Sequence, residues 1–168
     1  MKGNVYFIGF MGTGKSTIGR AVAQKLNLDF IDTDALITEQ SGMPIPKIFE
    51  IYGEDYFRVL ESKLIVDLAR GSNRIISTGG GTPLYHGNMK NMRDNGLIIA
   101  LETSTTILWS RLKGCEDRPI LQKYNTFEKF DRLYRHRKSV YDKADIIIKT
   151  DGKSIDQLVT ECIEQILD

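Results

Sequence analysis

Five short runs that are typical of β-strands alternate along the chain with longer stretches whose apolar residues recur at helical spacing. These runs are "NVYFIG" at 4–9, "DFID" at 29–32, "RIIST" at 74–78, "LIIAL" at 97–101 and "ADIIIKT" at 144–150. Apolar residues on both faces of a run are typical of parallel strands that helices cover on both sides. The sequence therefore predicts a three-layer α/β/α domain with ligand chemistry at the carboxyl ends of its strands.

The last segment of the chain carries the clearest helical pattern. Ser154, with Gln157 three residues later, forms a capping box that predicts the start of a helix. The apolar residues that follow at helical spacing are Ile155, Leu158, Val159, Cys162, Ile163, Ile166 and Leu167. A helix early in the chain is expected to bury the face formed by Ile18, Ala21, Val22 and Leu26.

Composition limits the possible partners. A length of 168 residues and a net charge of +1 indicate one domain over 1–168 and no nucleic-acid binding. Cys115 and Cys162 are far apart and form no Cys-x-x-Cys pair, so we expect reduced cysteines and a cytoplasmic protein. No apolar stretch approaches the roughly 20 residues that cross a bilayer, so we expect no membrane association. We also expect the chain to be a monomer.

The octapeptide "GFMGTGKS" at 9–16 follows the first β-rich run and precedes a helical pattern. It fits the P-loop pattern Gly-x-x-x-x-Gly-Lys-Ser, whose glycines permit the positive φ values of a phosphate-binding nest at a helix N-terminus. Lys15 can reach the β- and γ-phosphates of a nucleotide, and the Ser16 hydroxyl can ligate Mg²⁺. The motif therefore predicts a nucleotide-binding loop.

Several classes of P-loop protein carry signals that are missing from this sequence. A GTPase would carry Asn-Lys-x-Asp to read guanine, and a motor or AAA-type ATPase would be longer and carry a strand that ends in Asp-Glu. The sequence contains neither signal. The remaining interpretation is a compact kinase that phosphorylates a small molecule.

Two carboxylates follow the second β-rich run, in "DTD" at 32–34. If the backbone stays extended there, alternation points both side chains into one pocket. Asp32 could then hold Mg²⁺, through water, and Asp34 could receive the hydroxyl of an acceptor. The alternative is that both carboxylates cap a helix that begins near Ala35, which also leaves them beside a magnesium site.

Three later segments carry further candidates. "FRVLE" places Arg58 and Glu61 three residues apart on a helix, either as a positioned guanidinium or as an ordinary surface ion pair. The glycines at 79–81 indicate close backbone approach to a ligand, with a flexible turn as the alternative. The segment 114–125 has little apolar periodicity and is expected to be a mobile lid that excludes water during phosphoryl transfer.

Together these motifs resemble shikimate kinase over nearly the whole chain. The matching segments are "GFMGTGKSTIGRAVA", "FIDTDALI", "FRVLES", "ISTGGGTP", "DRPIL" and "RKSVY". The resemblance implies transfer of the γ-phosphoryl group of ATP to the 3-hydroxyl of shikimate, with Mg²⁺, in aromatic amino-acid biosynthesis. It also implies a five-stranded parallel sheet in the order 2-3-1-4-5, as in nucleoside monophosphate kinases.

The resemblance also implies roles for individual residues. The expected ATP-binding residues are Gly12, Thr13, Gly14, Lys15, Ser16, Thr17, Arg111, which packs on adenine, and the lid residue Arg118. The expected shikimate-binding residues are Asp34, Phe49, Phe57, Arg58, Gly79, Gly80, Gly81 and Arg137. Ser16 and Asp32, with Ser77 as a further candidate, are expected on the Mg²⁺ side, and the catalytic residues are Asp34, Lys15 and Arg118.

Some alternatives stay open at the level of sequence. If the family motif is aligned on Arg-x-x-x-Tyr, Arg137 is the second arginine that binds the shikimate carboxylate. A shifted alignment gives Arg135 instead. Asp34 could act as a true base or only orient the hydroxyl. Rival functions are a kinase for gluconate or another polyol, and a regulatory nucleotide-binding module without turnover.

Overall fold

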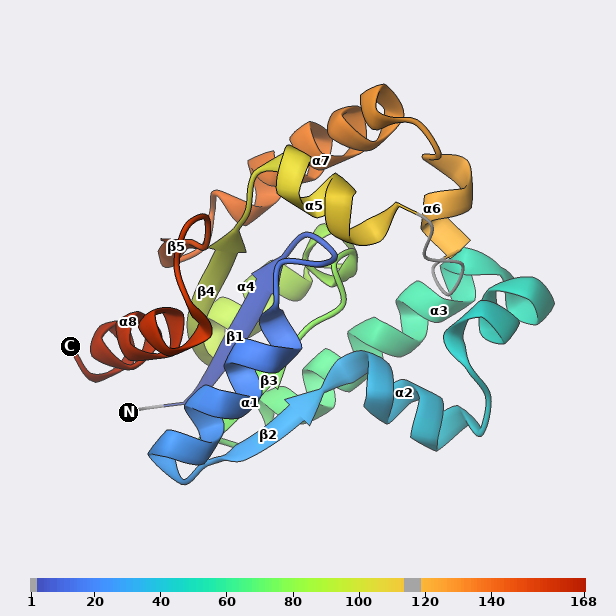
Figure 1. Cartoon of the computed structure of the whole chain (residues 1–168). Helices are drawn as coiled ribbons and strands as arrows, with labels where there is room; N and C mark the ends of the chain where they lie inside the picture. The colour runs from blue at the N-terminus through green and yellow to red at the C-terminus, as the bar shows by residue number, and fades with distance from the viewer. Residues whose placement is uncertain (1–2, 114–118) are drawn as a thin grey trace.

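The computed structural model describes residues 3–113 and 119–168. Its centre is a parallel five-stranded sheet in the order β2-β3-β1-β4-β5, with helices on both faces (Figure 1). The strands are β1 Asn4–Gly9, β2 Asp29–Asp32, β3 Arg74–Ser77, β4 Gly96–Glu102 and β5 Ile146–Lys149. The predicted three-layer fold and strand order are confirmed.

Eight α-helices lie in the described part of the chain. They are α1 Lys15–Leu26, α2 Thr33–Ser41, α3 Ile45–Ala69, α4 Asn88–Asp94, α5 Thr105–Leu112, α6 Pro119–Lys123, α7 Phe127–Tyr141 and α8 Ile155–Leu167, together with the short 3₁₀ helix η1 Thr82–Leu84. The capping box predicted at Ser154 is present at the start of α8. No helix among these is both long and apolar enough to cross a membrane.

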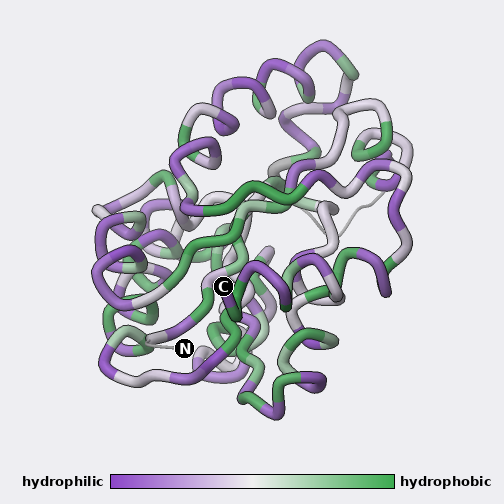
Figure 2. Tube along the Cα trace, turned by 90° about the vertical axis from the view of Figure 1, so that its left-hand side faces the viewer, coloured by the Kyte–Doolittle hydropathy of each residue, from purple (hydrophilic) through white to green (hydrophobic). Residues whose placement is uncertain are grey.

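The side chains of the central strand divide the core into two parts. Val5 and Phe7 on β1 pack toward α1 and α8, whereas Tyr6 and Ile8 pack toward α3, α4 and α7. This alternation follows from the pleat of a strand, which sends successive side chains to opposite faces. Hydrophobic colour accordingly follows the central strands in Figure 2, and hydrophilic colour is frequent on the outer helices.

The parallel arrangement fixes where the functional residues gather. Asp32 at the end of β2 pairs with Ser77 at the end of β3, and β1 ends beside them at Gly9. The P-loop, the "DTD" segment and the three glycines therefore leave the sheet at the same edge.

Several local expectations need correction. Part of the segment 114–125 is helical, because α6 spans Pro119–Lys123 and buries Leu121 against the core. Ile147 on the edge strand β5 is 42% exposed, so this strand is not covered on both faces. Ile155 and Leu167, at the two ends of α8, are also exposed.

The helix α3 contains a break that the sequence analysis did not predict. Gly53 has φ 82° and ψ 169°, so residues 45–52 and 54–69 form two helical halves that meet at an angle. A non-glycine residue rarely adopts such a φ, although no atom lies within 4 Å of where its Cβ would be. The glycine is therefore required here by the backbone conformation and not by lack of space.

Candidate active site

The loop between β1 and α1 has the geometry of a phosphate nest. Gly12 and Gly14 have φ values of 80° and 92°, and Gly14 is the N-cap residue of α1. The Lys15 ammonium donates to the carbonyl oxygens of Gly9 at 3.0 Å and Phe10 at 2.8 Å. Thr13 donates to the Phe10 carbonyl at 2.9 Å. The loop is thus held in shape by its own side chains, with the positive end of the α1 dipole behind it.

Asp32 has two roles in the structure. Its Oδ1 accepts hydrogen bonds from the backbone N–H groups of Asp34 and Ala35, which makes it the N-cap of α2. Its Oδ2 accepts from the Ser16 hydroxyl at 2.5 Å, and the Ser16 and Ser77 hydroxyl oxygens are 3.2 Å apart. The carboxylate that caps the helix therefore also faces the P-loop.

Asp34 reaches the site in a different way from the one that the sequence predicted. The helix α2 begins at Thr33, so Asp34 lies in a first helical turn and not on an extended segment. The prediction assumed an extended backbone with alternating side chains at 32–34, and the N-cap at Asp32 ends that extended backbone. Asp34 Oδ1 nevertheless lies beside the glycine segment, 2.8 Å from where a Cβ on Gly79 would be.

Each of the three consecutive glycines leaves space for a different group. A Cβ on Gly79 would lie 2.7 Å from Glu61 Oε1, as well as against Asp34. One on Gly80 would lie 3.7 Å from Arg137 Nη1 and 3.3 Å from the Met11 backbone nitrogen in the P-loop. One on Gly81 would lie 2.6 Å from Arg58 Nη1.

None of these three glycines has a positive φ, so their role comes from the missing side chain and not from backbone freedom. The sequence predicted close approach to a ligand. The structure shows close approach to the protein's own carboxylates, guanidinium groups and P-loop.

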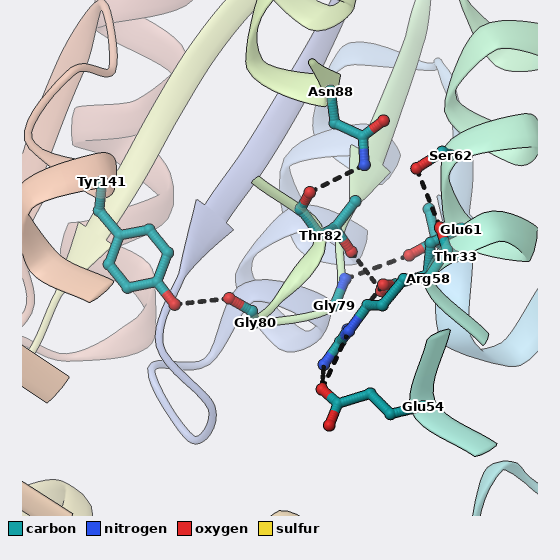
Figure 3. A network of polar contacts seen from close by, with 10 residues as sticks. All are labelled: Thr33, Glu54, Arg58, Glu61, Ser62, Gly79, Gly80, Thr82, Asn88 and Tyr141. Atoms are coloured by element: carbon teal, nitrogen blue, oxygen red, sulfur yellow. Dashed lines mark hydrogen bonds and ion pairs between the residues drawn. The ribbon is translucent and has the colours of Figure 1, made fainter. Parts of the chain in front are cut away.

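The Arg58 side chain is buried among acidic and aromatic groups, as Figure 3 shows in part. Its Nη1 donates to Glu61 at 2.6 Å, and its Nη2 donates to Glu54 at 2.9 Å. Glu61 is itself buried and accepts from the Thr82 hydroxyl at 2.5 Å. Burial alone would lower the pKa of Arg58, but Glu61 and Glu54 outweigh it and raise the pKa above its usual value. The Arg58–Glu61 pair is therefore not a surface ion pair.

Arg137 and Arg135 differ sharply although they are two residues apart on α7. Arg137 is 4% exposed, and its guanidinium carbon lies 5.6 Å from the centre of the Phe10 ring. It forms no ion pair with any residue that the structure describes. Arg135 is exposed and pairs with Asp131 at 2.7 Å. Of the two arginines, Arg137 is the one beside the glycine segment.

Tyr141, one turn after Arg137, is a site residue to which the sequence analysis gave no role. Its hydroxyl donates to the Gly80 carbonyl at 2.5 Å, which ties α7 to the glycine segment (Figure 3). Burial raises the pKa of this hydroxyl to about 12, and the nearby Arg137 works against that rise. The hydroxyl therefore stays protonated and able to donate over the neutral range.

The remaining candidates lie around this centre. Phe49 and Phe57, both on α3, pack ring to ring at 5.1 Å and form an apolar wall. The Arg111 side chain, on α5, donates to the Gly12 carbonyl at 2.9 Å, which places it at the P-loop. Thr17 is exposed in the first turn of α1. Arg118 and the adjoining residues 114–117 lie outside the described residues.

Known proteins match this chain over nearly its whole length. The sequence model of the family described as shikimate kinase matches residues 11–167. The chain belongs to the shikimate kinase family. A shikimate kinase from Sulfurihydrogenibium sp. (strain YO3AOP1) is 44% identical over 163 residues, which are 97% of this chain and 97% of that protein.

Solved structures agree with this assignment. A shikimate kinase from Acinetobacter baumannii, solved in complex with shikimate, has a TM-score of 0.93 and 31% identity and covers 99% of this chain and 94% of its own. A gluconokinase from Sinorhizobium meliloti has a TM-score of 0.63 at 15% identity, covering 99% of this chain and 92% of its own. At this identity the gluconokinase shares the fold alone.

The site of this shikimate kinase family member also contains residues that the sequence motifs did not identify. Glu54 contacts Arg58, and Phe10 contacts Arg137, yet neither stands in a motif whose chemistry requires it. The spacing Arg-x-x-x-Tyr was the available signal for Tyr141, because residues four apart on a helix share a face. The same spacing in Glu54-x-x-x-Arg58 was the available signal for Glu54, and no comparable signal pointed to Phe10.

Proposed function

We propose that the chain transfers the γ-phosphoryl group of ATP to the 3-hydroxyl of shikimate, with Mg²⁺. The observation that carries the proposal is the glycine segment at 79–81, which brings Asp34, Arg58 and Arg137 together next to a phosphate-binding loop. An acceptor with both a carboxylate and hydroxyl groups fits this set of side chains, because guanidinium groups bind carboxylates and a carboxylate binds hydroxyls.

On the acceptor side, Arg137 supplies the strongest argument. A buried guanidinium without an ion-pair partner is unfavourable, and an anionic ligand would relieve that cost. Arg58, on the other side of the glycine segment, would contact the same carboxylate. Phe49 and Phe57 would pack against the carbon ring of the acceptor.

On the donor side, backbone N–H groups of residues 12–16 and the Lys15 ammonium would bind the phosphates of ATP. Ser16 and Asp32 would hold Mg²⁺ from one side, and their hydroxyl and carboxylate oxygens are the ligand type that this ion prefers. In the described part of the chain no group of three or more His, Cys, Asp or Glu side chains could hold a metal. Mg²⁺ would therefore be held jointly by the protein, by water and by the phosphates, and would neutralise their charge.

For the chemical step, Asp34 would orient the attacking hydroxyl and accept its proton. Lys15 would exchange its two carbonyl partners for the phosphates, and Arg111 would lie over the nucleotide at the P-loop. We retain the proposal that Arg118 belongs to a lid that closes over the phosphates. We also propose a monomer as the active unit, in the cytoplasm.

The test is formation of ADP from MgATP with shikimate, gluconate or no acceptor. We expect turnover with shikimate only. Asp34→Asn should keep ATP binding and lose more than about 100-fold in kcat, while Asp29→Asn, which changes an exposed carboxylate at the start of β2, should behave as wild type. Binding of ATP without turnover of either acceptor would instead favour the regulatory module. Full activity in Asp34→Asn would remove Asp34 from the mechanism.

A further inference from the structure

We propose that Glu54 occupies the part of Arg58 that the acceptor carboxylate needs, and that acceptor binding displaces Glu54 into solvent. This inference rests on the proposed function. It concerns a residue that competes with the substrate, and so sets which acceptors can enter, and not one that takes part in the chemistry.

The contacts of Arg58 leave few routes to its guanidinium. The rings of Tyr85 and Phe57 lie 4.7 Å and 5.3 Å from the guanidinium carbon, which restricts access to the flat faces. An incoming carboxylate must therefore bind at the edge, where the N–H donors point. The acceptor needs an edge position that is open or that can be vacated.

Glu54 and Glu61 already use three of the five N–H donors of Arg58. One oxygen of Glu54 accepts from Nη2 at 2.9 Å and from Nε at 3.3 Å, and Glu61 accepts from Nη1 at 2.6 Å. Figure 3 shows Glu54 and Glu61 on different sides of the guanidinium. Two N–H donors remain, one on Nη1 and one on Nη2, but a carboxylate bound there would lie next to both glutamates at once. The Nε–Nη2 edge, which could bind a carboxylate through two parallel hydrogen bonds, is the edge that Glu54 takes.

The two glutamates differ in how easily they can leave. The Glu61 side chain is 1% exposed and is also held by Thr82, so moving it would bury an unpaired charge. The Glu54 side chain is 37% exposed, and water can solvate it once it leaves Arg58. Glu54 is also the first residue after the break at Gly53, so no regular helical turn precedes it to restrict its side-chain rotamers.

Charge also favours displacement. Arg58 already pairs with two carboxylates, Glu54 and Glu61, and the acceptor would bring a further carboxylate to the same guanidinium. Departure of Glu54 keeps the number of carboxylates on Arg58 at two, and it exchanges a half-exposed partner for a substrate that Arg137 would hold as well.

The experiment compares Glu54→Gln with Asp55→Asn, which removes the same charge from the exposed neighbouring residue. Shikimate binding is measured by calorimetry, and KM and kcat are measured for shikimate and for ATP. We expect Glu54→Gln to lower the Kd and KM for shikimate about threefold or more, with kcat and the KM for ATP unchanged. Asp55→Asn should change none of these values.

A second acceptor separates competition from a structural effect. With the methyl ester of shikimate, which carries no carboxylate charge, Glu54→Gln should give no gain. A raised Kd for shikimate in Glu54→Gln would overturn the proposal, since Glu54 would then be positioning Arg58 for the substrate. An equal gain in Asp55→Asn would also overturn it, because the effect would be one of general charge. If wild-type protein neither binds nor phosphorylates shikimate, the proposed function fails first, and the comparison of variants is not reached.

Discussion

At the scale of single residues, the glycines at 79–81 show how a site can depend on side chains that are missing. The sequence indicated that something approaches the backbone here, and it could not indicate what, because the approaching groups come from α2, α3 and α7. Gly81 gives the clearest example. Its φ of −88° suits any residue, yet a Cβ would lie within 2.6 to 2.7 Å of three guanidinium atoms of Arg58.

Gly81→Ala should therefore weaken acceptor binding and leave the fold intact. Arg58 is flexible enough to move away from the new methyl group, and its position relative to the glycine segment would shift with it. We expect the KM for shikimate to rise about tenfold, a loss of about 1.4 kcal/mol, with the KM for ATP unchanged. Steady-state kinetics with each substrate varied in turn measures both values.

Gly42→Ala is the control for this prediction. At Gly81 the backbone conformation allows a side chain but the space is filled, whereas at Gly42 the space is open but the conformation disfavours a side chain. Gly42, the C-cap residue of α2, has φ 67° and no atom within 4 Å of a new Cβ. It should lower the free energy of unfolding by about 1 kcal/mol and leave both KM values unchanged. If Gly81→Ala lost stability and kept its KM, the close approach of Arg58 would have no functional role.

At the scale of elements, sequence patterns located the strands well and the irregular features poorly. All five predicted strands agree with the structure within two residues at each end, because short apolar runs with Ile and aromatic residues fit few other environments. The helix α6 was missed because five residues are too few to show a period. The break at Gly53 was missed because one glycine inside an apolar pattern is compatible with an unbroken helix.

Asp32 joins two elements, and two substitutions can separate its roles. In Asp32→Asn the amide oxygen can still accept from the backbone of α2, so we expect stability within about 0.5 kcal/mol of wild type. The proposed Mg²⁺ side loses its charge, so the Mg²⁺ concentration for half-maximal activity should rise about tenfold. Asp32→Ala removes the cap as well and should lower the free energy of unfolding by about 1 to 2 kcal/mol.

Urea unfolding and Mg²⁺ titrations of activity on both variants test this separation. The idea fails if Asp32→Asn binds Mg²⁺ as wild type does. It also fails if Asp32→Asn and Asp32→Ala lose the same stability, since the hydrogen bonds from Asp34 and Ala35 would then contribute nothing measurable.

At the scale of the whole molecule, the strand order decides which segments meet. Alternation of strands and helices predicts a parallel sheet, but pairing between strands distant in sequence leaves no local pattern, so the order came from resemblance to a family. That order places β3 between β1 and β2, which sets the glycine segment between the P-loop and Asp34. The helix α7 then brings Arg137 and Tyr141 from more than 50 residues further along the chain.

Arg137 is a buried cation whose ion-pair partner is proposed to be the substrate. Its substitution should therefore change the free energy of unfolding differently with and without that substrate. Arg137→Met keeps much of the side-chain length and removes the charge. Without ligand, we expect its free energy of unfolding to equal that of wild type or exceed it by about 1 to 3 kcal/mol. Shikimate at 100 times its Kd should stabilise wild type by about 2.7 kcal/mol and should not stabilise the variant, whereas MgATP should stabilise both.

Arg135→Met is the matched control, since this arginine is exposed and, among the described residues, its one ion pair is with Asp131 on the same helix. Its stability and its response to shikimate should stay within about 0.5 kcal/mol of wild type. Urea unfolding of the three proteins with and without each ligand gives all the values needed. If Arg137→Met instead lost several kcal/mol without ligand, contacts such as that with Phe10 would already stabilise the cation. The fold would then depend on Arg137 for its own stability, and the substrate carboxylate would not be its missing partner.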